Sequence, residues 1–422
     1  MKLRPIVAAL AAVSAMAAGS ALAAPKAYVS HSAIGTNQSC ASPGFNSVQA
    51  AVNAVPANGT VYLCGAVPFE EQVFLGKSVT ITGGPGASIK SPTTAAGFAP
   101  SSDTRFPLQF QNQNLFAPQA IVVVTGRDTK ATIKGIEVRG PLPGNNSCAN
   151  REYGVLVLEG FLHLTQASVT NAQDANPSLN GCQFGVGVQV GSKNWRYADF
   201  TQVVENFTAD AEIEKTTISG YAKNGIVIDG SGSDGDIHDN RVSGFGPTSV
   251  VAQNGIEIVR GATGEVYHNS VSANQYTGIG GASSTGVLLF GGCGDPLVTN
   301  VDVHNNTAVD NDVGISMNNY NPTCDGPATT PTTNRADNNK ISNSAVTNVS
   351  GFCDTTGSNC GGRGYQAGIA DVGSGDEIAN NKISGAGYKP NTTPPAAWVA
   401  PIDTTSFPTI TPNVQGNTYK PQ

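Results

Sequence analysis

Two carboxylates occupy comparable places in consecutive copies of a repeated segment. Asp229 closes the segment Asn-Gly-Ile-Val-Ile-Asp, and Glu257 lies inside the next copy, Asn-Gly-Ile-Glu-Ile. If each copy forms a strand of one sheet, the two side chains face outward as near neighbours. Carboxyl groups about 5–9 Å apart act as acid and base, or acid and nucleophile, in glycoside cleavage. The alternative is that both are ordinary solvated carboxylates.

Three of the five histidines are concentrated at one turn of the repeat. His238, His268 and His304 fall within two positions of that turn in three successive copies. Tyr267 comes between His238 and His304 in this alignment, and Asp239 is in register with His268. Such a patch could exchange protons or bind a metal, which makes the histidines candidate catalytic residues and Tyr267 a candidate substrate contact. The alternative is a polar edge, because three turn histidines alone do not define a metal geometry.

A Gly- and Ser-rich turn offers oxygen ligands. Asp229, Asp234 and Asp236 are spaced through Asp-Gly-Ser-Gly-Ser-Asp-Gly-Asp, as in a calcium loop. The segment lacks the distal Glu and the residue order of an EF-hand, so a flexible turn is the alternative. Calcium is therefore the one cofactor that the sequence suggests, through these three aspartates.

An aromatic insertion over residues 191–210 interrupts the repeats. Lys193, Trp195, Arg196 and Tyr197 lie within five residues. Aromatic rings could stack on sugar rings while the cations pair with uronate carboxylates. The alternative is a loop whose aromatic rings fold inward against the protein.

The elements that must position these residues are repeated strands. A short apolar run beginning Asn-Gly-Ile is followed by a turn and a second run of the type Ile-x-x-Asn-x-Ile, from about residue 224 to 385. The repeated asparagines, Asn240, Asn269, Asn306, Asn339 and Asn381, are 29, 37, 33 and 42 residues apart. A constant local pattern with variable insertions is typical of a solenoid, in which coils of roughly 20 residues stack at ~4.8 Å.

The repeat also predicts which side chains share a face. Period-two alternation directs one face of each strand into a common core, and the Asn side chain turns inward at a bend to bond its equivalent in the next coil. We expect two outward columns on the first strands. One contains Gln189, Asp229, Val259, Phe290 and Asn318, and the other contains Gly187, Val227, Glu257, Leu288 and Ser316.

Composition supports an all-β chain and excludes some functions. Of 422 residues, 50 are Gly and 25 are Pro, and only 13% are charged, against about 25% in ordinary soluble domains. The formal net charge of −7 and the lack of Lys/Arg clusters argue against nucleic acid as a partner.

The first residues predict export. Lys2 and Arg4 precede an Ala-rich apolar stretch, and Ala21-Leu22-Ala23 suits a signal peptidase, so we expect a signal peptide over residues 1–23 and a secreted or periplasmic protein. No later run is apolar enough to span a bilayer. All 8 cysteines follow residue 23. Sequence order suggests four disulfides among 105 possible pairings, Cys40–Cys64, Cys148–Cys182, Cys293–Cys324 and Cys353–Cys360.

The repeats resemble those of the pectin-lyase-like superfamily of right-handed parallel β-helices, with repeats of the NosD-like kind. The resemblance covers roughly residues 45–388, and residues 46–55 resemble that family's capping helix, with Val48, Ala51, Val52 and Val55 on one face. It implies an all-β, single-stranded right-handed parallel β-helix over residues 24–388. The Pro-rich tail, residues 389–422, would pack on this helix or cap its end.

The same resemblance makes an extracellular polysaccharide the expected partner of a monomeric protein. The family is rich in lyases, glycosidases, esterases and epimerases. The aspartate motifs of polygalacturonases and of alginate epimerases, and the Gly-Gly-x-Arg of pectin methylesterases, are absent from this sequence. Two hypotheses therefore stand, a polyuronate lyase or glycoside hydrolase, and a non-catalytic protein that binds glycans for adhesion or as an envelope component.

Overall fold

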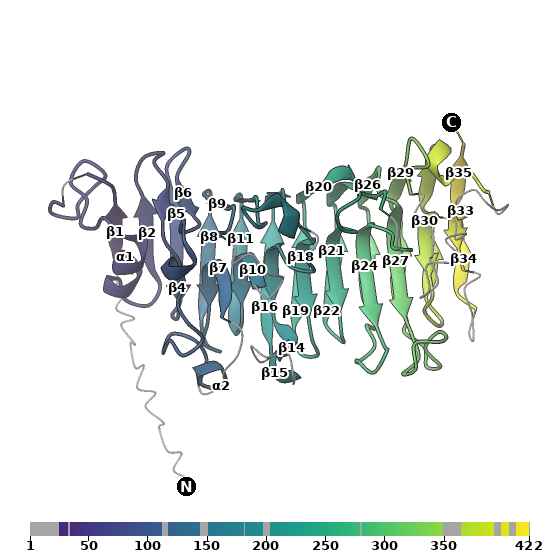
Figure 1. The fold of residues 1–422 in the computed structure, drawn as a ribbon, viewed down its shortest axis with the longest axis horizontal. Helices are drawn as coiled ribbons and strands as arrows, with labels where there is room; N and C mark the ends of the chain where they lie inside the picture. The colour runs from purple at the N-terminus through teal and green to yellow at the C-terminus, as the bar shows by residue number, and fades with distance from the viewer. Residues whose placement is uncertain are drawn as a thin grey trace, which may run out of the picture.

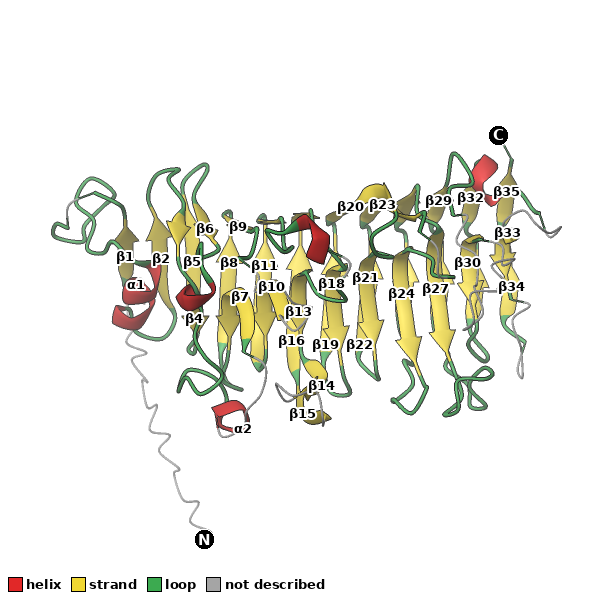
Figure 2. Cartoon of the chain, in the orientation of Figure 1, coloured by secondary structure: helices red, strands yellow, loops and turns green. Residues whose placement is uncertain are grey.

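The chain folds into an elongated right-handed parallel β-helix, as the sequence predicts. Strands of successive coils lie side by side along the long axis (Figure 1). Helices are few and short, and they lie outside the stacked strands (Figure 2). The computed structural model describes residues 25–32, 34–111, 117–143, 151–180, 182–196, 203–278, 281–348, 364–391, 398–404 and 411–421.

Three parallel sheets form the sides of the solenoid in these residues. The 12-stranded sheet contains β1 (Lys26–Val29), β2 (Gly59–Leu63), β5 (Val79–Gly83), β8 (Lys130–Lys134), β11 (Gly160–Thr165), β16 (Ala209–Glu214), β19 (Asp234–His238), β22 (Thr263–Tyr267), β25 (Asp302–His304), β28 (Arg335–Asp337), β31 (Glu377–Ala379) and β34 (Asn413–Gln415).

The 10-stranded sheet carries the candidate site. It contains β4 (Val73–Leu75), β7 (Pro118–Val124), β10 (Arg151–Val157), β13 (Val186–Val190), β18 (Asn224–Asp229), β21 (Asn254–Val259), β24 (Thr285–Gly291), β27 (Val313–Asn319), β30 (Tyr365–Asp371) and β33 (Trp398–Asp403). A two-stranded antiparallel hairpin follows β13 and consists of β14 (Ser192–Arg196) and β15 (Val203–Phe207).

The 11-stranded sheet closes each coil. It contains β3 (Phe69–Glu70), β6 (Ser88–Lys90), β9 (Glu137–Arg139), β12 (Ser168–Thr170), β17 (Thr217–Ser219), β20 (Arg241–Thr248), β23 (Ser270–Tyr276), β26 (Thr307–Val309), β29 (Lys340–Ser342), β32 (Lys382–Ser384) and β35 (Thr418–Lys420). The remaining described elements are α1 (Val48–Ala54), α2 (Leu108–Gln111), η1 (Ala95–Gly97), η2 (Pro177–Leu179) and η3 (Ala386–Tyr388).

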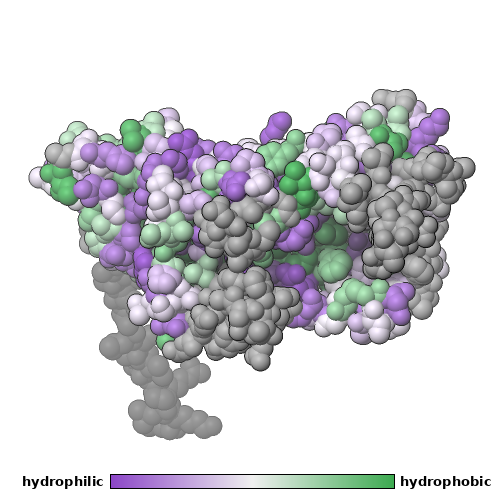
Figure 3. Space-filling model, viewed as in Figure 1, coloured by the Kyte–Doolittle hydropathy of each residue, from purple (hydrophilic) through white to green (hydrophobic). Residues whose placement is uncertain are grey.

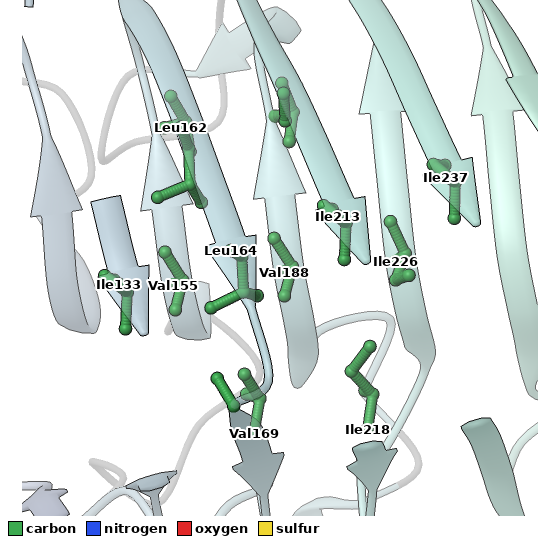
Figure 4. Close-up of a cluster of buried hydrophobic side chains, with 14 of the residues drawn as sticks. Ile133, Val155, Leu162, Leu164, Val169, Val188, Ile213, Ile218, Ile226 and Ile237 are labelled. Carbon is green, nitrogen blue, oxygen red and sulfur yellow. The ribbon is translucent and has the colours of Figure 1, made fainter. Parts of the chain in front are cut away.

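Inward side chains of like kind stack from coil to coil and form the core. Leu164 pairs in register with Ile213, which pairs with Ile237, and all three are fully buried. Figure 4 shows these side chains beside inward residues of the other two sheets. The stacking places apolar groups of similar shape in contact in each coil, so the core extends along the whole solenoid.

The predicted capping helix is confirmed. In α1, Val48, Ala51 and Val52 are buried against the first coil. The Ser47 hydroxyl accepts a hydrogen bond from the backbone N–H of Ala50, and the Glu71 carboxylate accepts from the N–H groups of Val48 and Gln49 at 2.6 and 3.0 Å. Both contacts satisfy amide groups that the first helical turn leaves without partners.

The predicted Asn ladder is also confirmed. Each ladder side chain donates from Nδ2 to Oδ1 of its equivalent in the next coil, at 2.9–3.1 Å, along Asn240, Asn269, Asn306, Asn339, Asn381 and Asn417. The same Oδ1 atoms accept the backbone N–H of the preceding ladder residue, as Asn306 does from Asn269. Every ladder amide therefore bonds both a side chain and the backbone, which makes burial of these polar groups tolerable.

Replacing a central ladder residue should destabilise the solenoid. Asn306→Ala removes the acceptor of the Asn269 backbone N–H and the donor to the Val266 carbonyl, both buried. Because unsatisfied buried groups cost about 1–3 kcal/mol each, we expect a loss of about 3 kcal/mol in urea unfolding. Asn413→Ala, at an exposed position, is the control. Equal stability of the two variants would contradict a structural role for the ladder.

Two predicted disulfides are present in the described residues. Cys40 is bonded to Cys64, and Cys293 to Cys324, with Cα–Cα distances of 5.5 and 4.7 Å. Cys182 is also disulfide-bonded. The expected signal peptide and Cys148, Cys353 and Cys360 lie outside the described residues. No described helix is long and apolar enough to cross a membrane.

The C-terminal tail adds a further coil to the solenoid. Strands β33, β34 and β35 extend all three sheets, and Asn417 extends the Asn ladder. The repeat therefore continues past residue 388, which the sequence pattern predicts as the end of the β-helix. Val414, Asn417 and Tyr419 have the spacing of Ile-x-x-Asn-x-Ile, but an aromatic residue replaces the last Ile, which concealed this copy.

A pair of buried carboxyl groups lies near the C-terminal end. Asp371 ends β30 and is hydrogen-bonded to Asp376, and both are almost fully buried. Asp376 Oδ1 accepts from Thr332 and from the Asn334 N–H, whereas Oδ2 receives no hydrogen bond from a described donor. A proton retained between the two carboxyl groups would supply that donor and remove the repulsion of two like charges. Burial, aided by the charge of Asp376, raises the pKa of Asp371 to about 7, and burial also raises the pKa of Asp376.

Stability should therefore fall as pH rises. The unfolded chain releases its carboxyl protons near pH 4, whereas the folded protein keeps the shared proton to higher pH. The contribution of this pair to the free energy of unfolding is therefore fully present below pH 4 and is lost as the pH rises toward 7. The whole change is at most about 4 kcal/mol. Asp371→Asn supplies an amide donor in place of the proton and should flatten the profile. Urea unfolding between pH 4 and 8 measures both proteins, and identical slopes would contradict the shared proton.

Candidate functional site

A groove whose charged lining has one more cation than carboxylates crosses the outward face of the 10-stranded sheet. It has a volume of about 570 Å³ and is lined from β10, β13, β14, β18 and β21 and the segments beside them. Its charged lining, here called the cationic groove, consists of Arg151, Lys193, Lys223 and Arg260 with Asp229, Glu257 and Asp295. The groove thus has four cations and three carboxylates, whereas the whole chain has a net charge of −7.

The strand register brings Asp229 and Glu257 to this groove. Glu257 pairs with Val227 and Asp229 with Val259, so the two carboxylates occupy neighbouring strands and face the same side. The outward columns are as expected from β18 to β27, but Gln189 pairs with Val227 rather than Asp229. The expected register was wrong by two residues at β13, because Gly-Val occurs twice in succession at 185–188 and either copy fits the repeat.

Asp229 is bound to Arg260. The carboxylate is almost fully buried, and Arg260 Nε donates to Oδ1 at 2.8 Å while Nη2 donates to Oδ2. Gln189 Nε2 also donates to Oδ2, at 3.3 Å. With both oxygens occupied, Asp229 holds the Arg260 guanidinium in a fixed orientation in the groove.

Glu257 and Lys223 interact electrostatically across the groove without a direct ion pair between them. Asn254 Nδ2 donates to Glu257 Oε2 at 3.2 Å, and Lys223 Nζ donates to the Ala252 carbonyl at 2.6 Å. Burial raises the pKa of Glu257 against the attraction of Lys223, and burial lowers the pKa of Lys223 against the attraction of Glu257. Both pKa values move toward neutral pH, which suits a general acid and a general base.

The hairpin after β13 contributes Lys193 to the same groove. Its ammonium group forms an ion pair with Asp295, which follows β24. Trp195 and Arg196 belong to β14, and Tyr197 lies outside the described residues. The predicted stacking of Trp195 and Tyr197 on sugar rings, and the predicted pairing of Arg196 with uronate carboxylates, stay predictions.

A second hollow continues the groove toward the C-terminal coils. It has a volume of about 350 Å³, shares Asp295 with the cationic groove, and includes Tyr320 and Pro322 beside the Cys293–Cys324 disulfide. The rings of Tyr320 and Phe290 are 5.9 Å apart. Figure 3 shows this face hollowed over the strands labelled β21 and β24 in Figure 1. The two hollows together run across the strands, along the solenoid axis.

The histidine patch lies on a different face from the groove. The Tyr267 ring is stacked between His238 and His304, with centroid distances of 4.8 and 5.2 Å, as its sequence position suggests. His268 contacts both Tyr267 and His304 edge-on. These residues belong to the outward face of the 12-stranded sheet and its turn, because the chain bends between β18 and β19. Their proposed catalytic and substrate-binding roles stay predictions.

The structure does not bring the three aspartates of the suggested calcium loop together. Asp229 ends β18 and faces Arg260, whereas Asp234 and Asp236 lie on β19 of the 12-stranded sheet. The bend between these strands separates the first carboxylate from the other two. Among the described residues, the His, Asp and Glu groups close enough to share a metal ion do not include Asp229, Asp234 or Asp236.

Several groove residues were missed by the sequence reading. Lys223 directly precedes one Asn-Gly-Ile copy, and Arg260 directly follows the next, so their flanking positions were a usable signal. Arg151 and Asp295 belong to segments distant in sequence, with no shared motif. Only the stacking of coils places them beside Asp229.

Comparisons with known proteins show a likeness of fold. No family model and no curated protein matches the chain. Among solved structures, it is similar to the Dettilon tailspike protein (14% identity, TM-score 0.46), covering 84% of this chain and 62% of that one. An alginate lyase from Paenibacillus has 12% identity and a TM-score of 0.46, with coverage of 88% and 96%. A periplasmic alginate epimerase has 12% identity and a TM-score of 0.40, with coverage of 89% and 84%. The chain thus spans less than two thirds of the tailspike.

Removing Asp229 should destabilise the protein through Arg260. Asp229→Ala leaves a half-buried guanidinium without its carboxylate, and we expect a loss of about 2–3 kcal/mol in urea unfolding. The double variant Asp229→Ala/Arg260→Leu should recover most of that loss, because no unpaired charge remains. Asp234→Ala removes an exposed carboxylate and is the control. Additive losses in the double variant would contradict a coupled pair.

Proposed function

We propose that the protein binds an acidic polysaccharide along the outward face of the 10-stranded sheet and cleaves it by β-elimination. The main support for this proposal is the cationic groove. It brings Arg151, Lys193, Lys223 and Arg260 together on a protein whose net charge is negative. The adjoining hollow lengthens the groove along the solenoid axis, which suits a polymer rather than a single small molecule.

Arg260 is the group best placed to bind a uronate carboxylate. Its guanidinium is fixed by Asp229, so little side-chain entropy remains to be lost on binding. A cation on the carboxylate of the sugar also stabilises the negative charge that develops there when the neighbouring C5 proton is removed. Phe290 and Tyr320 offer ring surface beside the groove for apolar faces of further sugar units.

Lys223 and Glu257 supply the proton transfers. Lys223, whose pKa is lowered by burial, takes the proton from C5 as the free amine. Glu257, whose pKa is raised by burial, gives its proton to the leaving oxygen on C4. The C5–H and C4–O bonds break, a C4–C5 double bond forms, and proton return from Lys223 to Glu257 restores the site. Hydrolysis fits less well because the other two carboxylates in the described lining of the groove, Asp229 and Asp295, are paired with Arg260 and Lys193.

The disulfides fit an exported protein. Cys40–Cys64 and Cys293–Cys324 persist in oxidising compartments, where a polysaccharide substrate is also found. A secreted or periplasmic protein, acting as a monomer, is therefore part of the proposal.

A second candidate function is glycan binding without catalysis. The observation in its favour is that Arg260 and Lys193 already have carboxylate partners, Asp229 and Asp295. Such pairs can fix a binding surface without doing chemistry.

Product release from alginate and polygalacturonate separates the two functions. Ultraviolet absorbance of unsaturated uronates should rise with the wild-type protein, and Lys223→Ala and Glu257→Gln should lower the rate by about 100-fold or more. Retardation in affinity gels should persist in Glu257→Gln and weaken in Arg260→Ala. Glu265→Gln, on another face, is the control. Retardation without any product would establish binding alone, and reducing ends without unsaturation would overturn elimination.

A further inference from the structure

A second cluster of ionisable side chains lies on the outward face of the 12-stranded sheet. His163 on β11 pairs in register with Glu212 on β16, and Glu214 lies two residues further along the same strand. All three side chains therefore face the same side of the sheet, away from the cationic groove. None of these three residues was among the site residues predicted from the sequence.

The separations within this cluster match a metal site. His163 Nε2 is 3.2 Å from Glu214 Oε1 and 3.9 Å from Glu212 Oε2, and one ligand atom from each residue lies within 4.8 Å of the others. Around a tetrahedral zinc ion, with bonds of about 2.0–2.2 Å, ligand atoms are about 3.3–3.6 Å apart. Small side-chain adjustments would therefore place all three atoms on one ion.

We propose that His163, Glu212 and Glu214 bind a zinc ion, with a fourth position open to solvent. One imidazole nitrogen with two carboxylates suits zinc, whereas calcium and magnesium prefer oxygen ligands alone. The three side chains are partly exposed, so an ion can reach them from solvent.

The surroundings of Glu212 support this assignment. His238 Nε2 lies 3.7 Å from Glu212 Oε1, on the opposite side from His163, which is longer than a hydrogen bond. The His238 ring is itself held by Asp239 at 3.1 Å and by stacking on Tyr267. Glu212 thus lies between two imidazoles and is hydrogen-bonded to neither, so its Oε2 atom can turn toward an ion on the His163 side.

The cation already present does not block the site. Lys215 bonds Glu214 Oε2, whereas the oxygen that faces His163 is Oε1, which also accepts from Thr165 at 2.8 Å. A comparable group of Glu265, Asp302 and His304 is less suitable. The Glu265 side chain is 52% exposed there, so holding it on an ion would cost more side-chain entropy than at Glu212.

Zinc titration calorimetry on the tag-free protein tests the proposal. We expect one zinc ion per chain, and at least a tenfold weaker affinity in His163→Ala and in the isosteric Glu212→Gln. His268→Ala, at an exposed histidine outside the cluster, should leave the zinc affinity unchanged. Circular dichroism confirms that each variant is folded, and cobalt(II) substitution should give the visible bands of a four-coordinate site.

Three results would overturn the zinc site. These are no binding by the wild-type protein, unchanged affinity in both His163→Ala and Glu212→Gln, or loss of binding in His304→Ala with His163→Ala unaffected. The site is independent of the elimination proposed above, because it lies on another sheet. Loss of zinc binding with polysaccharide cleavage intact, or the reverse, therefore distinguishes failure of one proposal from failure of the other.

Discussion

The structure depends on in-register hydrogen bonding between successive coils. Each coil places its strands beside the equivalent strands of its neighbours, at the spacing of a parallel sheet, about 4.8 Å. The same register stacks Leu164, Ile213 and Ile237 inside and links the Asn ladder at the bend. A slip of two residues in one strand would keep its apolar side inward but would end the ladder, so the ladder fixes register where apolar packing alone does not.

Register also builds surfaces from residues distant in sequence. Lys193 follows β13 and Asp295 follows β24, three coils further along, so the two residues are 102 positions apart in sequence and yet form an ion pair. The insertions lie in turns and loops and leave the strands aligned, so the sheet surface is constant while the loops vary. The cationic groove is assembled in this way, from strand positions that alternate outward and from loop residues beside them.

The two outward faces differ in their chemistry. The 10-stranded sheet gathers cations around Asp229 and Glu257, where burial shifts the pKa values of Glu257 and Lys223 toward neutral pH. The 12-stranded sheet places carboxylates and imidazoles in adjacent columns, with Tyr267 stacked between two histidines. We therefore propose a polyanion as the ligand of the first face and a divalent cation as the ligand of the second.

The sequence alone determined the fold, the capping helix, the Asn ladder and two of the disulfides. The coils and the ladder are local patterns repeated along the chain, the capping helix shows as an apolar face at helical spacing, and the two disulfides follow the order of the cysteines. Sequence also placed Asp229 and Glu257 on one face, because alternation in a strand is a local property. Only the tertiary structure decided that Asp229 is held by Arg260, that Lys223 lies beside Glu257, and that His163 meets Glu212 and Glu214. Those contacts join different coils, and which residues meet depends on exact register and on the bend between sheets, which the spacing of repeats does not specify.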